Sequence, residues 1–278
     1  MKWKESYTSF LFILPALGYV VYFSFYSAAN AAYQSFQTPV SHFVLSNYEG
    51  LVGFGLASAI LNTVAVTAGA LALQFLVSFI VASVLTREFK GKRAFTTLFI
   101  LPFGIATVVA AFSFMNIFAT TGGYANSLLR LFGLGPVNWY GNWWLDVFSI
   151  VVADSWKNTP VVTLVLLAGM TTIPSDIYKA ASIDGAGPLR RFSYITLPNL
   201  RNYVAIALII RGVSEFNIFA LPLILVGYNP ALLTTLTYEF YSTTASVYYS
   251  YASATVLLAF VFVLFLLSTR LRSASFWS

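Results

Sequence analysis

Apolar runs that are long enough to cross a lipid bilayer recur along the chain, and they restrict its fold more than any other feature. A helix needs about 20 apolar residues at ~1.5 Å each to span a hydrocarbon core of roughly 30 Å. Six such runs are expected, over residues 9–32, 57–85, 95–118, 145–170, 203–226 and 251–271. With 59% hydrophobic and 9% charged residues, the composition is also unlike that of a soluble domain. The sequence therefore predicts an all-α integral membrane protein with six transmembrane helices in a single domain over residues 1–278.

The first apolar run has two readings, a membrane anchor and a cleaved signal peptide. A signal peptide has an apolar core of about 7–15 residues followed by a cleavage site between small residues. The run over 9–32 is longer, and no clear site of that kind with polar flanking sequence follows it. We therefore expect this run to remain in the membrane.

Basic residues indicate which loops face the cytoplasm, because cationic loops resist translocation. Twelve of the 15 Lys and Arg residues fall on one side of the six expected spans. They are Lys2, Lys4, Arg87, Lys90, Lys92, Arg93, Lys179, Arg190, Arg191, Arg201, Arg270 and Arg272. Both termini are therefore expected in the cytoplasm of a multi-pass cell-membrane protein. The net charge of +6 follows from this topology, and not from a contiguous basic face of the kind that binds nucleic acid.

Residues that perform catalysis or bind metal are scarce in this sequence. It has no cysteine and a single histidine, His42, so neither a thiolate nucleophile nor a His/Cys metal site can be assembled. No segment matches the phosphate-binding pattern G-x-x-x-x-G-K-[ST]. We therefore expect no catalytic residue and no metal ligand, and any energy from ATP must reach this chain from another one.

Residues 175–198, hereafter the coupling loop, interrupt the apolar pattern on the side assigned to the cytoplasm. A short helix is expected from about Asp176 to Asp184, with Ser175 as its cap and Asp176 in the positive first turn. Ala180 and Ala181 leave one face of this helix low, so that another protein can approach it closely. The pattern predicts a docking element.

A turn and a second helix are expected in the second half of the coupling loop. Gly185 and Gly187 favour an open backbone, and Pro188 suits the first position of a helix over 188–196. Pro198 is expected to end that helix before the fifth apolar run. A plain connector is the alternative, but packed helices need only about 2–8 connecting residues.

Charged and amide side chains inside the apolar runs are functional candidates, because they are costly to bury in lipid. Asp154 with Lys157, and Arg211 with Glu215, have the spacing of pairs on one helix face. They are either self-neutralising structural pairs or part of a hydrophilic path in which aromatic faces and polar groups meet a sugar. The residues proposed to line or gate that path are Trp156, Asn158, Arg211, Glu215, Asn217, Tyr238 and Tyr241.

The coupling loop carries a family resemblance. The segment AASIDGA over 180–186, followed by Leu197 and Pro198, resembles the EAA loop of ABC-importer permeases. The flanking stretches DSWKNTP (154–160), LAGM with Ile173-Pro174 (167–174) and 215–230 are similar to sugar permeases of the maltose-transporter kind. The likeness extends from about Asn62 to the C-terminus.

The resemblance implies a type I ABC-importer permease for a sugar or oligosaccharide. Its expected partners are a second permease chain, related but different, two cytoplasmic ATPase subunits and an extracytoplasmic solute-binding protein. ATP and Mg²⁺ would be bound by the ATPase, so this chain holds no cofactor and is not itself an enzyme. The residues that would contact the ATPase are Lys179, Ala180, Ala181, Asp184, Gly185, Ala186 and Gly187.

Two positions depart from the family pattern. Lys179 stands where the family usually has Glu, and Gly227–Pro230 replaces a turn richer in glycine. The first reverses a charge at the expected ATPase contact, and the second weakens the sugar assignment. A permease for another small polar solute, an ATPase-independent secondary transporter and a membrane-embedded enzyme are the alternatives. The last lacks any nucleophile, metal cluster or catalytic dyad.

Overall fold

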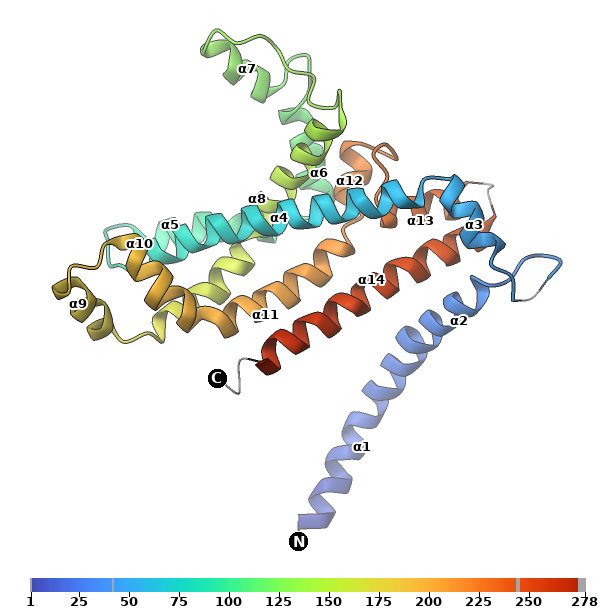
Figure 1. Ribbon diagram of the computed structural model, residues 1–278, viewed down its shortest axis with the longest axis horizontal. Helices are drawn as coiled ribbons and strands as arrows, with labels where there is room; N and C mark the ends of the chain where they lie inside the picture. The colour runs from blue at the N-terminus through green and yellow to red at the C-terminus, as the bar shows by residue number, and fades with distance from the viewer. Residues whose placement is uncertain (1, 42, 244–245, 275–278) are drawn as a thin grey trace. The chain divides into compact units, whose positions relative to one another are not determined.

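The structure is a computed structural model that describes residues 2–41, 43–243 and 246–274, so His42 lies outside the described residues. Every regular element within these ranges is helical (Figure 1). The α-helices are α1 (Lys2–Val20), α2 (Ser27–Gln34), α3 (Ser46–Gly53), α4 (Leu56–Leu85), α5 (Lys92–Ile100), α6 (Thr107–Ile117), α7 (Tyr124–Leu131), α8 (Trp143–Thr171), α9 (Ser175–Ile183), α10 (Pro188–Arg191), α11 (Leu197–Phe216), α12 (Ala220–Leu225), α13 (Leu233–Ser242) and α14 (Val247–Ala274). The π-helical segments Val21–Tyr26 and Phe192–Thr196 join α1 to α2 and α10 to α11, and the 3₁₀ turn Leu101–Gly104 follows α5.

Helices occupy all six expected apolar runs. Within the described residues, three helical segments are long and apolar enough to cross a membrane, namely Phe10–Gln34, Leu56–Leu85 and Trp143–Thr171. They coincide with the first, second and fourth expected runs. α11 occupies most of the fifth run, and α14 begins four residues before the sixth.

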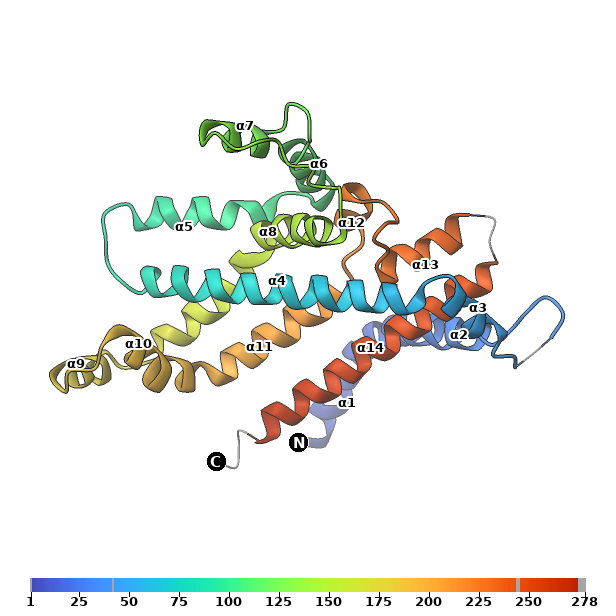
Figure 2. The same ribbon diagram turned by 45° about the horizontal axis from the view of Figure 1, so that its top comes forward.

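The third apolar run is broken in its middle, where the sequence suggested one uninterrupted helix. Lys92–Gly104 and Thr107–Ile117 together are long and apolar enough to form a span, but they meet at an angle of 100° (Figure 2). Pro102 lies in the 3₁₀ turn at the end of the first part, and Ile105 and Ala106 are extended, each with ψ 137°. Proline and an extended dipeptide both stop a helix, which explains the bend.

The fifth run is also interrupted, near the end that the sequence placed at residue 226. α11 ends at Phe216 and α12 begins at Ala220. Between them the Asn217 side chain donates to the Val213 carbonyl at 2.8 Å, and Phe219 (φ −131°, ψ −66°) leaves the helical conformation. α12 then packs against α6, which the bend in the third run brings into position.

The chain divides into two compact units. Unit 1 consists of Met1–Ser58 and Leu236–Ala259, and unit 2 consists of Ala59–Thr235 and Phe260–Ser278. In unit 1 the Phe54 ring lies 5.5 Å from Phe240 and 5.4 Å from Tyr249 between centroids. The single permease domain expected over the whole chain stays a prediction.

Unit 2 contains three helices, α4, α8 and α11, whose contacts position the polar residues discussed below. α11 packs along α8, and glycine permits a close approach there, because a Cβ at Gly169 would lie 2.6 Å from Tyr203 Cδ2. Two apolar clusters lie in the described part of the unit. The first is Val66, Ala111, Phe114, Phe118, Ile150, Ala153, Ile218, Leu221, Leu225 and Leu232, and the second is Ala82, Val162, Leu166, Met170, Leu200 and Ala207.

Candidate functional site

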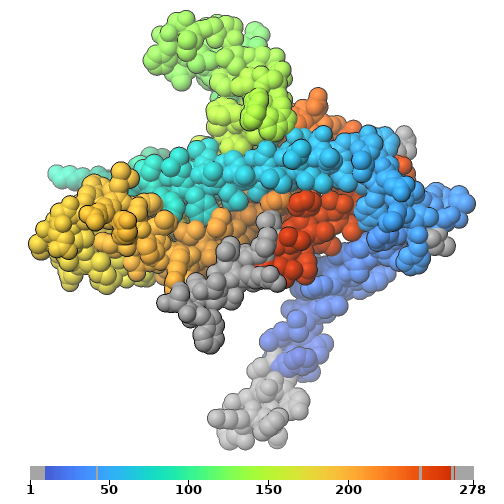
Figure 3. All heavy atoms as spheres, viewed as in Figure 1, coloured from blue at the N-terminus to red at the C-terminus, as the bar shows by residue number. Residues whose placement is uncertain are grey.

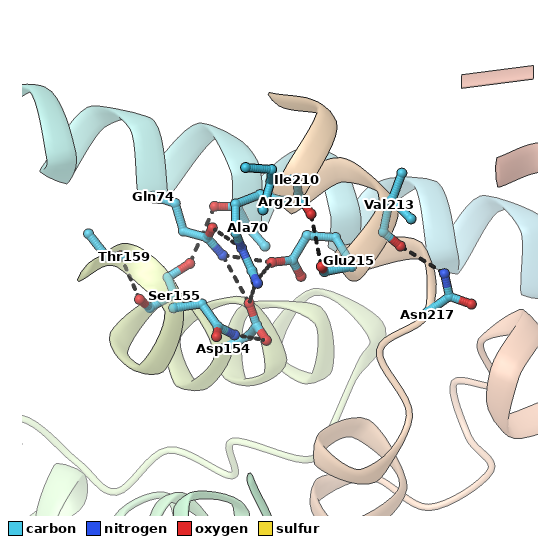
Figure 4. A network of polar contacts seen from close by, with 12 residues as sticks. Ala70, Gln74, Asp154, Ser155, Thr159, Ile210, Arg211, Val213, Glu215 and Asn217 are labelled. Carbon is cyan, nitrogen blue, oxygen red and sulfur yellow. Dashed lines mark hydrogen bonds and ion pairs between the residues drawn. The ribbon is translucent and has the colours of Figure 1, made fainter. Parts of the chain in front are cut away.

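Between these two apolar clusters, five polar side chains from three helices meet in the interior of unit 2 (Figure 4). We call them the polar cluster: Gln74 from α4, Asp154 and Asn158 from α8, and Arg211 and Glu215 from α11. Residues separated by more than a hundred positions in the sequence are therefore brought into hydrogen-bonding distance. The helices that carry four of the five side chains, α8 and α11, are the two that flank the coupling loop.

Arg211 and Gln74 bridge the two carboxylates of the polar cluster. The Arg211 guanidinium forms ion pairs with Glu215 and, at 3.6 Å, with Asp154 Oδ2. Gln74 Nε2 donates to Asp154 Oδ2 and to Glu215 Oε1, each at 2.9 Å. Arg211 Nε donates to Gln74 Oε1 at 3.2 Å, so the amide uses both its ends.

Four of the five side chains of the polar cluster are buried, and Asn158 is half-buried at its edge. Arg211 is 7% exposed and Glu215 is 1% exposed. Asn158 Nδ2 donates to Asp154 Oδ1 at 2.8 Å, and within the described chain Glu215 Oε2 is the one buried carboxylate oxygen of the cluster without a hydrogen-bond partner. Such charges are tolerated in a membrane interior when they are paired and hydrogen-bonded. In this conformation the cluster joins helices and does not present an open binding surface.

Of the two expected charge pairs, one is confirmed and the other is not. Arg211 pairs with Glu215 as the four-residue spacing predicted, but the expected pair between Asp154 and Lys157 was wrong. Lys157 Nζ instead lies 5.5 Å from the centroid of the Phe103 ring, a cation–π arrangement. Asp154 is drawn to Arg211 because a guanidinium can serve two carboxylates in the same buried site.

Gln74 was not among the residues expected at this site. A signal was present, because Gln74 is a long amide side chain in the middle of the apolar run over 57–85, where most residues are aliphatic or small. An amide at that position needs partners from neighbouring helices, since both its donor and its acceptor must be satisfied in an apolar interior.

The other expected path residues do not join the polar cluster. Trp156 lies on the exposed side of α8 and contacts the Phe114 ring at 5.4 Å between centroids. Asn217 is exposed at the break after α11. Tyr238 and Tyr241 lie on α13 in unit 1, both with exposed side chains. The expectation that these residues line one path with Asn158 stays a prediction.

The coupling loop has the helix, turn and helix that its sequence predicts. α9 ends in a Schellman motif, in which the Ala186 N–H donates to the Ala181 carbonyl at 2.9 Å and the Gly185 N–H donates to Ser182 at 3.2 Å. Gly185 is left-handed with φ +74°, a conformation that suits glycine. Gly187 is extended and precedes Pro188, which begins α10 as expected.

Two details of the loop differ from the expectation. Ser175 is the first helical residue and not the cap, because Pro174 occupies the capping position without a side-chain hydrogen bond. Pro198 does not end the second helix, which continues through the π-helical segment Phe192–Thr196 into α11. A wider π turn before the proline relieves the clash that its ring would make with the carbonyl four residues earlier. The loop is therefore directly continuous with α11.

Two contacts fix the base of the coupling loop, one to α4 and one within the loop itself. The Phe192 ring meets Phe79 of α4 edge to face, with centroids 5.2 Å apart. Tyr178 and Thr196 share a hydrogen bond between hydroxyls at 2.9 Å, which ties α9 to the start of α11. The loop is thereby anchored at its base.

The turn of the coupling loop, away from the base, is exposed on the surface; the loop is the yellow segment in Figure 3. Ile183 is 87% exposed and Leu189 is 83% exposed, on either side of the turn. Lys179 Nζ lies 2.8 Å from Asp176 Oδ1 on the outer face of α9. Exposed apolar side chains beside a rigid turn are typical of a surface that meets another protein.

Comparison with known proteins gives a consistent set of relatives. Residues 74–274 match the family described as binding-protein-dependent transport system inner membrane component. The chain is 31% identical over 275 residues to the trehalose/maltose transport system permease protein MalF of Thermococcus litoralis, covering 95% of this chain and 92% of that protein. It is 31% identical over 229 residues to the arabinooligosaccharides transport system permease protein AraP of Bacillus subtilis, covering 78% and 73%.

Solved structures share the fold. A chain of a bacterial ABC transporter involved in the import of the acidic polysaccharide alginate matches with a TM-score of 0.77 at 20% identity, covering 98% of this chain and 96% of that one. A second structure of the alginate transporter, in complex with a pentasaccharide-bound periplasmic protein, matches with a TM-score of 0.79. At this identity the likeness establishes the fold alone.

Proposed function

This chain belongs to the binding-protein-dependent transport system inner membrane components, and from that premise we propose that it is the permease subunit of an ATP-driven importer of a sugar or oligosaccharide. The names of its relatives support the substrate class, because they transport trehalose, maltose and arabinooligosaccharides. As a membrane transport subunit of this family it does not hydrolyse ATP itself.

The coupling loop is the observation that carries the proposal. It presents Ile183 and Leu189 on a rigid helix–turn–helix whose base is held by Phe192 and Tyr178. A rigid, exposed apolar tip suits insertion into a cleft of a partner protein. We propose that the coupling loop inserts into a cytoplasmic ATPase. The residues that would contact the ATPase are Lys179, Ala180, Ala181, Asp184, Gly185, Ala186 and Gly187.

The full transporter would contain several further chains. Two cytoplasmic ATPase subunits would bind ATP and Mg²⁺, a related but different permease chain would complete the translocation path, and an extracytoplasmic solute-binding protein would deliver the sugar. Both termini of this chain would lie in the cytoplasm, in agreement with its distribution of basic residues.

Lys179 modifies the expected ATPase contact. The EAA loop that this segment resembles usually has Glu at the position, and here the ammonium group is paired with Asp176 in the same helix. Because the pair neutralises itself, the partner surface opposite α9 does not need an acidic residue to match Lys179. The pair is exposed, so its own contribution to stability is small.

The proposed mechanism is alternating access, in which ATP binding moves the coupling loop and the loop moves the helices that flank it. α8 precedes the loop and α11 continues directly from it, and the polar cluster joins these two helices to α4. A displacement of the loop is thereby passed to helices in the membrane interior. Trp156, Asn158, Asn217, Tyr238 and Tyr241, which are exposed or half-buried, would line the path, and the buried pair of Arg211 and Glu215 would line or gate it.

The test is sugar-stimulated ATP hydrolysis by the complex reconstituted in liposomes with its solute-binding protein. Stimulation by a di- or oligosaccharide, and its loss when this chain is omitted, is the expected result. Stimulation by a non-sugar solute and by no sugar would contradict the proposed substrate class but would still support the role of a permease subunit. Solute uptake by this chain without an ATPase would contradict the proposal and favour a secondary transporter.

A further inference from the structure

A small polar pocket lies in unit 2 at the start of α8, apart from the polar cluster. Its volume is about 210 Å³, and its walls are Tyr140, Gly141, Asn142, Trp143, Asp146, Asn229 and Pro230. We call it the Asp146 pocket. Two sequence segments therefore meet there, the residues that lead into α8 and the turn that follows α12.

The Asp146 pocket contains a buried carboxylate that the protein does not satisfy. Asp146 is 8% exposed, and within residues 2–41, 43–243 and 246–274 its side chain has no hydrogen bond and no ion pair. It lies in the first turn of α8, where the positive end of the helix dipole stabilises a carboxylate without a neighbouring cation. Its oxygens are not among the buried side-chain atoms that lack a partner in the described chain, so they are accessible from the pocket and can accept hydrogen bonds from an occupant.

Tyr140 supplies a second unsatisfied group in the same pocket. Its Oη is buried and makes no hydrogen bond to the described residues. Burial, together with the nearby charge of Asp146, raises the pKa of Tyr140 to about 12, so the phenol keeps its proton at neutral pH. The pocket thus offers a phenol donor beside a carboxylate acceptor.

The walls of the pocket are fixed in place. Trp143 Nε1 donates to Asn62 Oδ1 at 2.6 Å, and Asn62 Nδ2 donates to the Ala231 carbonyl at 2.8 Å. Asn62 therefore holds both segments of the pocket to α4. A site whose shape exists before a ligand arrives loses less entropy on binding.

We propose that the Asp146 pocket binds one ring of the imported carbohydrate through its hydroxyl groups; this rests on the proposed function. A cation or a basic side chain needs acceptors alone, whereas this pocket presents a carboxylate together with the Tyr140 hydroxyl and the side-chain amides of Asn142 and Asn229. A sugar hydroxyl both donates and accepts, which suits this mixture of donors and acceptors. The volume is below the roughly 300–1,000 Å³ of sites for drug-sized ligands, which limits the occupant to about one ring.

The position of the pocket along α4 suits a first contact with the sugar. Asn62 is ~18 Å along the helix from Gln74 and ~25 Å from Phe79, which contacts the coupling loop, at ~1.5 Å per residue. The pocket and the coupling loop therefore lie at opposite ends of the helix. With the loop at the cytoplasmic end, the pocket is at the end where the solute-binding protein delivers its cargo.

The test is equilibrium binding of radiolabelled maltose and trehalose to the purified transporter complex without its solute-binding protein. Asp146→Asn and Tyr140→Phe should each raise the Kd about tenfold, which corresponds to ~1.4 kcal/mol, the size of one hydrogen bond. Tyr124→Phe is the matched control, because it removes a hydroxyl from an exposed tyrosine on α7 and should leave the Kd unchanged. Tyr140→Phe deletes a hydroxyl without a partner, so it should fold as well as the wild type even if Asp146→Asn does not.

Three results would overturn the pocket assignment. The first is that the wild type shows no saturable binding of either sugar, and the second is an unchanged Kd in Tyr140→Phe. The third is loss of binding in Asp154→Asn while both pocket variants bind normally, because that result would place the sugar at the polar cluster. Each of these leaves sugar-stimulated ATP hydrolysis by the complete wild-type complex intact. Absence of that stimulation with every sugar would instead remove the proposed function.

Discussion

Replacement of Arg211 by methionine should destabilise the protein, because Arg211 forms ion pairs with two buried carboxylates. Asp154 Oδ2 and Glu215 Oε1 each lie 2.9 Å from Gln74 Nε2, so the two oxygens are no more than about 5.8 Å apart. At an effective dielectric constant of ~20, two like charges at that distance repel by ~3 kcal/mol. Loss of Arg211 therefore leaves a repulsion of about 3 kcal/mol, or forces one carboxylate to take up a proton.

A second change should relieve that repulsion. In Arg211→Met/Glu215→Gln one negative charge is gone, so the double variant should be more stable than Arg211→Met alone although it departs further from the natural sequence. This direction separates charge repulsion from simple loss of packing, because packing defects would add. It also follows the general behaviour of buried ion pairs, in which removal of one partner costs more than removal of both.

Thermal unfolding of the detergent-solubilised complex, followed by intrinsic fluorescence, measures the effect. At roughly 2–4 °C per kcal/mol for a chain of this size, Arg211→Met should lower Tm by about 6–12 °C, and the double variant should recover a large part of that loss. Arg190→Met is the matched control, because Arg190 is exposed on the coupling loop and its removal should leave Tm unchanged. A double variant that is no more stable than Arg211→Met would refute the reasoning from the two carboxylates.

Three further predictions concern the loop and the pocket. Gly185→Val forces a branched side chain into a backbone with φ +74° and should reduce sugar-stimulated ATP hydrolysis while the chain still inserts normally. Gly135→Ala, at an exposed glycine outside the coupling loop with open space around it, should not, and equal activities of the two variants would refute the role of the turn. Phe192→Ala removes the contact with Phe79 and should speed hydrogen exchange across residues 175–196; an unchanged rate would contradict anchoring by this ring. The pKa of Tyr140 is raised to about 12 from 10.0, so the neutral phenol stabilises the fold below pH 10 and this stability is lost as the pH rises towards 12. The Tm of Tyr140→Phe should therefore fall less than that of the wild type over this range, and identical alkaline unfolding of the two proteins would contradict this prediction.

The apolar runs and the coupling loop could be read from sequence because both follow from local chemistry. Length and apolarity define α4 and α8 to within a few residues, and Gly185 with Pro188 defines the turn. The same local rules failed at Pro198, where a π-helical segment absorbs the proline and lets the helix continue. A proline predicts the end of a helix only where the turn before it is an ordinary α turn, because a π turn leaves room for the proline ring.

The polar cluster was only partly predictable because it is a product of tertiary packing. Helical spacing correctly paired Arg211 with Glu215, but spacing within one helix cannot reveal that Asp154 turns toward a neighbouring helix and away from Lys157. Gln74 enters the cluster from a third helix, and no local pattern connects it to the others. The Asp146 pocket also depends on tertiary packing, because its two wall segments are joined through Asn62 of a third segment.

Site-directed photo-crosslinking tests most directly the central claim that the coupling loop contacts the ATPase. The chain has no native cysteine, so a single Ile183→Cys on the exposed tip of the loop can carry a cysteine-directed photo-crosslinker as the one labelled site of this chain. Leu131→Cys, which is 81% exposed on α7, is the matched control. We expect a covalent product between Ile183→Cys and the ATPase subunit and none from Leu131→Cys. An ATPase product from Leu131→Cys, or none from Ile183→Cys in an active complex, would contradict it.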